Sequence, residues 1–165
     1  MIARFQSNFA NCRCQACRNI KSNGECPVIF VTSSIKGEGK TFVSVNLALT
    51  LSSLNKKVLL IGADLRNPQL HKYLNILKNR IGLSNYLYDP RTDWKSLINE
   101  KAFDNEFLNI IFAGSVTPNA AELLSNGRFE ELLAILKKEY DYIIVDTAPT
   151  ILVTDTFLIS QNCIF

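Results

Sequence analysis

The sequence predicts an α/β fold in which helices flank a doubly wound, mostly parallel β-sheet. Three observations lead to this prediction. Short runs of β-branched and aromatic residues alternate with longer stretches of helical periodicity. The runs are apolar along their whole length, which is typical of parallel strands buried on both faces. The 165 residues, 47% of them hydrophobic and 20% charged, suit one globular domain with a real core.

Four strands and several helices can be placed from these patterns. The expected strands are Val28–Ser33, Val58–Ile61, Leu108–Phe112 and Tyr142–Val145. The expected helices are Lys40 to about Leu54, Asn67–Tyr73, Ile81–Tyr88, Asp93–Leu97, Ala120–Leu124, Arg128–Lys138 and Thr154–Ser160.

The predicted domain begins after an unusual N-terminal stretch. We expect residues 1–26 to be an irregular or helical extension and residues 27–165 to form the domain, with no internal repeat or linker to divide it. A sheet of this type normally continues past Asp146 with another helix and one or two strands. We therefore expect the sheet to be incomplete at its C-terminal end.

Composition narrows the function classes. The net charge of +3 is small and its basic residues are dispersed, which argues against nucleic acid as a partner. No apolar run approaches the roughly 18 residues that span a bilayer. The N-terminus MIARFQSNFANC lacks the apolar core of a secretory signal. These features predict a soluble, cytoplasmic protein.

Cysteines crowd the N-terminal extension. Cys12, Cys14, Cys17 and Cys26 lie within fifteen residues, and Cys163 stands near the end of the chain. An odd count with such crowding does not resemble a disulfide framework. A zinc site usually pairs two separated C-x-x-C motifs, whereas one is present here, so reduced thiols are the favoured interpretation over a metal site.

A glycine-rich segment between a strand and a helix predicts a phosphate-binding loop. Gly37 and Gly39 can adopt positive φ, so that successive backbone N–H groups form a nest for an anion at the helix N-terminus. Lys40 would reach the β- and γ-phosphates of a nucleotide, and the Thr41 hydroxyl would bind magnesium. The candidate ATP-binding residues are Ser34, Ile35, Lys36, Gly37, Glu38, Gly39, Lys40, Thr41 and Phe42.

The loop meets the general pattern G-x-x-x-x-G-K-[ST] imperfectly, because Ser34 takes the place of the first glycine. The alternative is a glycine-rich turn that binds no ligand. A lysine followed by threonine at a helix start has no obvious packing role, so ATP binding is favoured.

Two carboxylates follow predicted strands and could serve a magnesium ion. Asp146 ends YIIVD, and Asp64 follows VLLIG by two residues. Carboxylates at the ends of neighbouring parallel strands are suited to hold the metal and its waters. A turn role for Asp146 and a helix-cap role for Asp64 remain the alternatives.

Taken together, the segments SSIKGEGKT, VLLIGADLR and YIIVDTAP resemble the bacterial tyrosine kinases of exopolysaccharide and capsule biosynthesis. A fourth segment, Gly114–Ser125, looks like that family's G-x-x-P-P-N-P-x-E-L-L-x-S motif. The resemblance covers about residues 27–160. It is more specific than the loop alone, because four motifs occur in order.

The resemblance implies a P-loop domain that autophosphorylates tyrosine with ATP and Mg²⁺. It implies catalytic roles for Lys40, Asp64 and Arg66, the last matching the arginine of a D-x-D-x-R motif, and magnesium contacts from Thr41, Asp64 and Asp146. It also implies a homo-oligomer at the inner face of the plasma membrane, with an inner-membrane polysaccharide co-polymerase, fused or separate, as activator.

The sequence departs from the family pattern in four places. Gly62 stands where the family usually has the first aspartate of D-x-D, and the last strands are not accounted for. The family's E-x-x-R-x-x-R subunit-contact helix corresponds to Gln15-x-x-Arg18-x-x-Lys21. No terminal tyrosine cluster is present, and the tyrosines are scattered at Tyr73, Tyr86, Tyr88, Tyr140 and Tyr142.

Two other functions stay open. One is a partitioning-type P-loop ATPase, a class that resembles K-G-G-x-x-K with a lysine five residues before the catalytic one; Ile35 occupies that position here. The other is an inactive remnant that keeps the loop but binds nucleotide weakly.

Overall fold

A five-stranded sheet forms the centre of the computed structural model, which describes residues 26–74 and 81–149. The strand order is β1-β5-β2-β4-β3. Neighbours in β1-β5-β2-β4 are parallel, and β3 pairs antiparallel with β4. The strands are β1 (Val28–Val31), β2 (Val58–Gly62), β3 (Ile98–Asn99), β4 (Leu108–Ile111) and β5 (Tyr142–Asp146).

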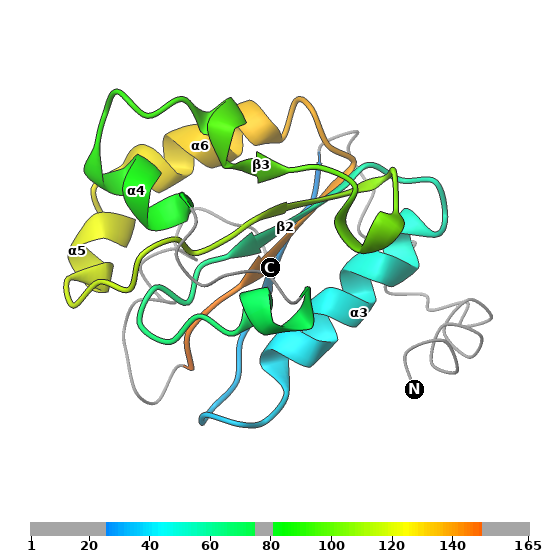
Figure 1. Ribbon diagram of the computed structural model, residues 1–165, viewed down its shortest axis with the longest axis horizontal. Coiled ribbons are helices and arrows are strands. Elements are labelled where there is room, and N and C mark those ends of the chain that lie inside the picture. The colour runs from blue at the N-terminus through cyan, green and yellow to red at the C-terminus, as the bar shows by residue number, and fades with distance from the viewer. Residues whose placement is uncertain (1–25, 75–80, 150–165) are drawn as a thin grey trace.

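Helices cover both faces of this sheet (Figure 1). The long helix α3 packs on one face, and α4, α5 and α6 pack on the other. This arrangement confirms the predicted α/β fold with a mostly parallel sheet. The helices are α3 (Lys40–Ser52), α4 (Leu83–Tyr88), α5 (Ala120–Leu124) and α6 (Arg128–Leu136), with 3₁₀ turns η1 (Leu70–Tyr73), η2 (Trp94–Leu97) and η3 (Ala102–Asp104).

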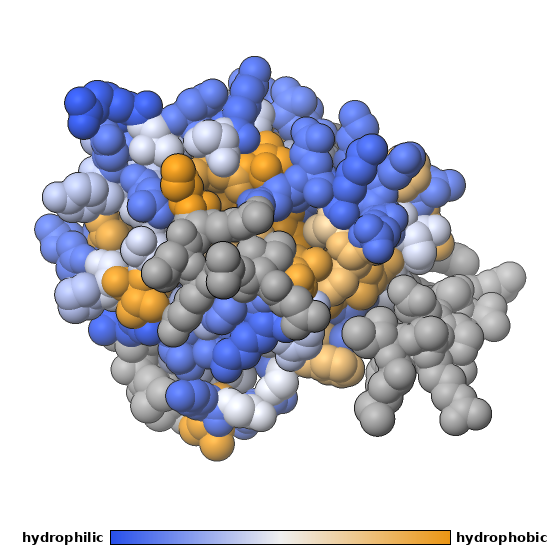
Figure 2. Space-filling model, viewed as in Figure 1, coloured by the Kyte–Doolittle hydropathy of each residue, from blue (hydrophilic) through white to orange (hydrophobic). Residues whose placement is uncertain are grey.

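Side-chain alternation along the strands divides the core into two layers. In β2, Leu60 faces the layer under α3, whereas Leu59 and Ile61 face the layer under α4, α5 and α6. All five residues of β2 and of β5 are buried, as expected for central parallel strands. In the view of Figure 2, hydrophilic residues predominate around the margin, and hydrophobic residues show in the middle of the face.

The expected helix at Asn67–Tyr73 is wrong in its first half. The segment turns before η1 begins, because the Asp64 Oδ1 accepts a hydrogen bond from the Asn67 backbone N–H at 2.9 Å. The Gln69 amide then donates to the carbonyl oxygens of Asn67 and Pro68. These local bonds compete with helix formation, so the helical part starts at Leu70.

Other differences are small. The first strand ends at Val31 and α6 at Leu136, and β3 and η3 were not predicted. A two-residue strand such as β3 is too short for a periodic pattern. The predicted helix Thr154–Ser160, the expected C-terminal incompleteness and four of the five cysteines lie outside the described residues.

The expectations about cysteines and about membrane-spanning segments can be compared with the described residues. Cys26 is half-buried and packs against the core. Residues 26–74 and 81–149 contain no helix long and apolar enough to cross a membrane.

Candidate functional site

The predicted phosphate-binding loop joins β1 to α3, as the sequence requires. Gly37 and Gly39 have φ values of 96° and 89°. A Cβ at either position would meet no atom within 4 Å, so backbone conformation rather than space favours glycine there. Gly39 is also the N-cap of α3, and the amide end of this helix therefore opens directly onto the loop.

The loop is held by one of its own side chains. A Glu38 carboxylate oxygen accepts hydrogen bonds from the backbone N–H groups of Ser34 and Ile35, at 2.8 and 3.1 Å. The bonds close the loop on itself. Glu38 therefore has a structural role beyond the backbone contact that the sequence suggested.

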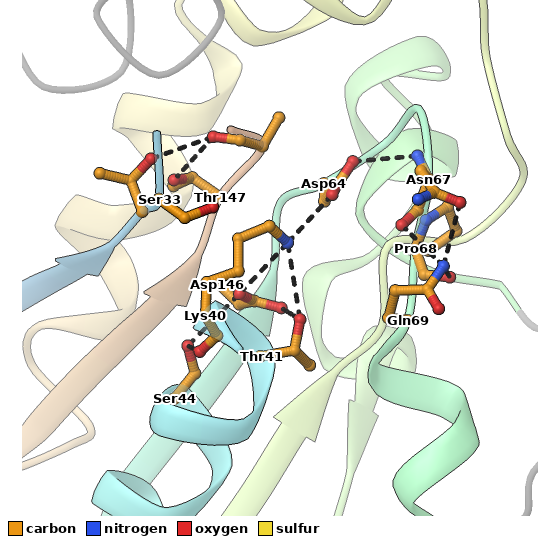
Figure 3. A network of polar contacts seen from close by, with 12 residues as sticks. Ser33, Lys40, Thr41, Ser44, Asp64, Asn67, Pro68, Gln69, Asp146 and Thr147 are labelled. Atoms are coloured by element: carbon orange, nitrogen blue, oxygen red, sulfur yellow. Dashed lines mark hydrogen bonds and ion pairs between the residues drawn. The ribbon is translucent and has the colours of Figure 1, made fainter. Parts of the chain in front are cut away.

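Lys40 lies between the two predicted carboxylates (Figure 3). Its Nζ is 3.0 Å from Asp64 Oδ2 and 3.6 Å from Asp146 Oδ1. The Thr41 hydroxyl donates to Asp146 Oδ2 at 2.8 Å. The structure thus brings together a lysine, a hydroxyl and two carboxylates that are up to 106 positions apart in the sequence (Lys40 to Asp146).

Sheet register explains this convergence. Gly62 of β2 pairs with Asp146 of β5, so both strands end at the same level. The Ala63 N–H donates to the Asp146 carbonyl at 2.8 Å, which carries Asp64 to the site one residue later. Ligand sites at the carboxyl edge of a parallel sheet are typical of doubly wound folds.

Burial changes the pKa of the Asp146 carboxyl. Only 3% of its side chain is exposed, and desolvation raises the pKa of this carboxyl above its ordinary value of 3.8. Lys40 and the Thr41 hydroxyl oppose the rise in the Asp146 pKa, and Asp64 adds to it. Lys40 and Thr41 therefore favour the charged form of a carboxyl whose burial, together with Asp64, disfavours that form.

Ser44, which was not among the predicted site residues, also reaches this centre. Its hydroxyl lies 2.9 Å from the Lys40 carbonyl and 3.3 Å from Asp146 Oδ1. Ser44 follows Thr41 by three residues, so both lie on the same face of α3. That spacing was the signal that could have identified it.

A pocket of about 710 Å³ opens in front of these residues. Asp146 lies behind it, buried beneath Lys40 and Thr41, and Ser34, Ile35 and Glu38 are loop residues that do not line it. The segment after β2 supplies a wall of the pocket. The sequence pointed to Asp64 and Arg66 in this segment but not to its other lining residues, Asn67, Gln69, Lys72 and Tyr73. The lining residues are Lys36, Gly37, Gly39, Lys40, Thr41, Phe42, Asp64, Arg66, Asn67, Gln69, Lys72, Tyr73, Ala148 and Pro149.

These groups fit a magnesium-bound triphosphate. The described residues hold no cluster of three or more acidic, histidine or cysteine ligands that would bind a metal ion unaided. A hydroxyl beside a carboxylate is instead the protein's share of a site that phosphate oxygens and water complete. The lysine and the helix N-terminus suit the anion itself.

Fold and site together define the class of the protein as a P-loop nucleotide-binding domain. Residues 27–165 match the family model of an AAA domain. The solved kinase domain of VpsO is 31% identical with a TM-score of 0.80, over 98% of this chain and 78% of that one. The kinase domain of the Escherichia coli tyrosine kinase ETK is 33% identical with a TM-score of 0.76, over 84% and 52%. Within the AAA-domain proteins, the chain belongs to the family of bacterial tyrosine kinases.

Curated relatives are longer than this chain. The tyrosine-protein kinase CpsD of Streptococcus pneumoniae is 36% identical over 148 residues, which cover 89% of this chain and 64% of that protein. The tyrosine-protein kinase ptk of Acinetobacter johnsonii is 39% identical, over 74% and 16%. The chain therefore spans less than two thirds of either relative.

A septum site-determining protein has a similar fold. MinD of Pyrococcus horikoshii, solved with Mg-ADP, is 26% identical with a TM-score of 0.61, over 73% of this chain and 48% of that one. Both values are lower than those of the two kinase domains.

Proposed function

We propose that this chain is the catalytic domain of an ATP-dependent protein-tyrosine kinase that phosphorylates itself and acts in exopolysaccharide or capsule biosynthesis. One observation carries the proposal: Lys40, Thr41, Asp64 and Asp146 converge at the mouth of the glycine loop. The sequence identity to proteins named as tyrosine kinases supports a kinase over other P-loop functions.

Each residue has a part in the proposed reaction. Bound ATP would supply the phosphoryl group, and its magnesium ion would neutralise part of the charge on the phosphates. Lys40 and the loop amides would bind phosphate oxygens, and Thr41 and Asp146 would hold the metal. Asp64 would accept the proton of the attacking tyrosine hydroxyl, because its carboxylate lines the pocket whereas that of Asp146 lies behind it. Arg66 lines the same wall and would add positive charge there.

The proposal extends to location and partners by likeness to the relatives. The chain would work at the inner face of the plasma membrane as a homo-oligomer, activated by a membrane co-polymerase. One of the similar structures is described as the chimerical protein CapA2B2.

Incubation of the purified chain with γ-labelled ATP and Mg²⁺ tests the kinase function. We expect label on tyrosine, lost in Lys40→Met. Because Lys40→Met leaves two buried carboxylates without their cation, Thr41→Val provides a second inactive variant that keeps the charges. Circular dichroism verifies that both variants are folded.

Two results would contradict the kinase. Release of inorganic phosphate without protein label would favour the partitioning-type ATPase. Absence of nucleotide binding by the folded wild-type chain would favour the inactive remnant.

A further inference from the structure

The order of the strands indicates how a bound nucleotide would be oriented in the site. The glycine loop follows β1, whereas Asp146 ends β5 and Asp64 follows β2, and β5 and β2 are the next strands across the sheet. Thr41 and Asp146 would hold a metal that bridges the β- and γ-phosphates, and the γ-phosphate end would then point toward β2. An acceptor in line with the departing phosphate would approach from the segment between β2 and η1.

Positive charge gathers around this approach. Arg66 and Lys72 line the wall formed by the segment after β2, and Lys36 lines the loop side. Asp64 is the acidic residue among the pocket's lining residues, and it already lies 3.0 Å from Lys40. Among the described residues, no carboxylate pairs with Lys36 or Lys72, and both lysines are exposed.

Aromatic side chains stand beside these lysines. Tyr73 follows Lys72 on η1, and Phe42 lies on the first turn of α3. Both line the pocket, with 38% and 40% of their surfaces exposed. Exposed rings of this kind offer a stacking surface for the ring of an incoming tyrosine.

We propose that the acceptor of this domain is a tyrosine flanked by acidic side chains, and that Lys72 is the residue that selects this charge. The inference rests on the proposed kinase function, of which it names the substrate class. Acidic residues on either side of the tyrosine would meet Lys72 on one side and Lys36 on the other. A tyrosine flanked by lysines would meet like charges and bind less well.

Lys72 could instead serve the nucleotide phosphates, and the two roles predict different results. A phosphate contact would lower phosphorylation of every acceptor by the same factor. A contact with the acceptor would change the ratio between acceptors. The ratio of kcat/KM for two peptides of opposite charge is therefore the informative quantity, because effects on ATP cancel in it.

Three synthetic peptides with one tyrosine each, flanked by glutamates, serines or lysines, provide the test. With saturating Mg-ATP, we expect the wild-type chain to prefer the glutamate peptide to the lysine peptide by about tenfold, and less at high salt. In Lys72→Glu this ratio should fall below one. Lys138→Glu, which makes the same change of charge on an exposed residue after α6, should keep the wild-type ratio.

Equal use of the three peptides by the wild type, or an unchanged ratio in Lys72→Glu, would overturn the inference. Peptide affinity for the chain loaded with Mg²⁺ and a non-hydrolysable ATP analogue, measured by fluorescence anisotropy, gives the same ratio without turnover. Selective binding of the glutamate peptide without labelling of any peptide would contradict the kinase function but support the charge preference. Labelling of all peptides regardless of charge would contradict the charge preference but support the kinase function.

Discussion

Asp146 is the residue at which stability and function oppose each other. Burial raises the pKa of its carboxyl, so the folded protein binds more protons than the unfolded chain from pH 3.8 up to the raised pKa. The free energy of unfolding therefore falls as the pH rises through that interval. The proposed role of Asp146 as a magnesium ligand would explain why the chain keeps a buried charge that weakens the nucleotide-free fold.

Asp146→Asn should separate the two effects. The free energy of unfolding of this variant, relative to the wild type, should increase between pH 4 and pH 7, because the amide carries no charge to desolvate. Its magnesium-dependent affinity for nucleotide should fall by about 10- to 100-fold. Urea titrations at several pH values and a fluorescent ATP analogue measure the two quantities, with the exposed Asp104→Asn as control. A variant less stable than the wild type at pH 7 would contradict this account.

Gly62 stands where the resemblance to the tyrosine kinases implies an aspartate, and the room for a side chain there is limited. A Cβ at this position would lie 3.3 Å from the Ala113 backbone nitrogen and 3.4 Å from Leu70 Cδ2. Leu70, on η1, thus packs against the space that the side chain of an aspartate would need.

Gly62→Asp should lower the free energy of unfolding by about 1–3 kcal/mol, through crowding and a further carboxylate beside Asp146. Combining it with Leu70→Ala should cost less than the sum of the two single changes, because the smaller residue makes room. Chemical denaturation of the four proteins in this cycle measures the coupling. Additive effects would show that Leu70 does not limit the position.

At the scale of elements, the glycine loop depends on Glu38 for its shape. The two amides that this carboxylate accepts from lie at the start of the loop, ahead of the glycines. Loops ordered before binding pay less conformational entropy when the ligand arrives.

Glu38→Ala should therefore weaken nucleotide binding by about fivefold, the equivalent of roughly 1 kcal/mol for the lost hydrogen bonds. Glu106→Ala, an exposed glutamate ahead of β4, is the matched control. Titration with a fluorescent ATP analogue compares the dissociation constants. Tighter binding in Glu38→Ala would mean that the carboxylate competes with phosphate instead of shaping the loop.

At the scale of the whole molecule, most of the fold could be predicted from the sequence. The central strands are continuous apolar runs, and the glycine loop lies between a strand and a helix, as such loops do. The convergence of Lys40, Asp64 and Asp146 could be expected, since strands of a parallel sheet end at one edge. Ser44 could also have been expected, because it follows Thr41 by three residues on the same helix. The wall containing Lys72 could not, because it depends on the turn in which Asp64 accepts a hydrogen bond from the Asn67 backbone N–H, a contact without a sequence period. The antiparallel strand β3 could not be predicted either, because two residues are too few to show a period.

The polar centre also links the site to the stability of the whole domain. Lys40 is the cation that two buried carboxylates share, with 10% of its side chain exposed. Lys40→Met should lower the free energy of unfolding at pH 7 by about 3 kcal/mol, because it leaves both charges buried and unpaired. Adding Asp146→Asn should restore part of that loss, with a coupling of about 1–3 kcal/mol. Urea denaturation of the wild type, both single variants and the double variant measures this coupling. The assignment of Lys40 as the counter-charge of Asp146 would be wrong if the double variant were as unstable as the sum of the single changes predicts.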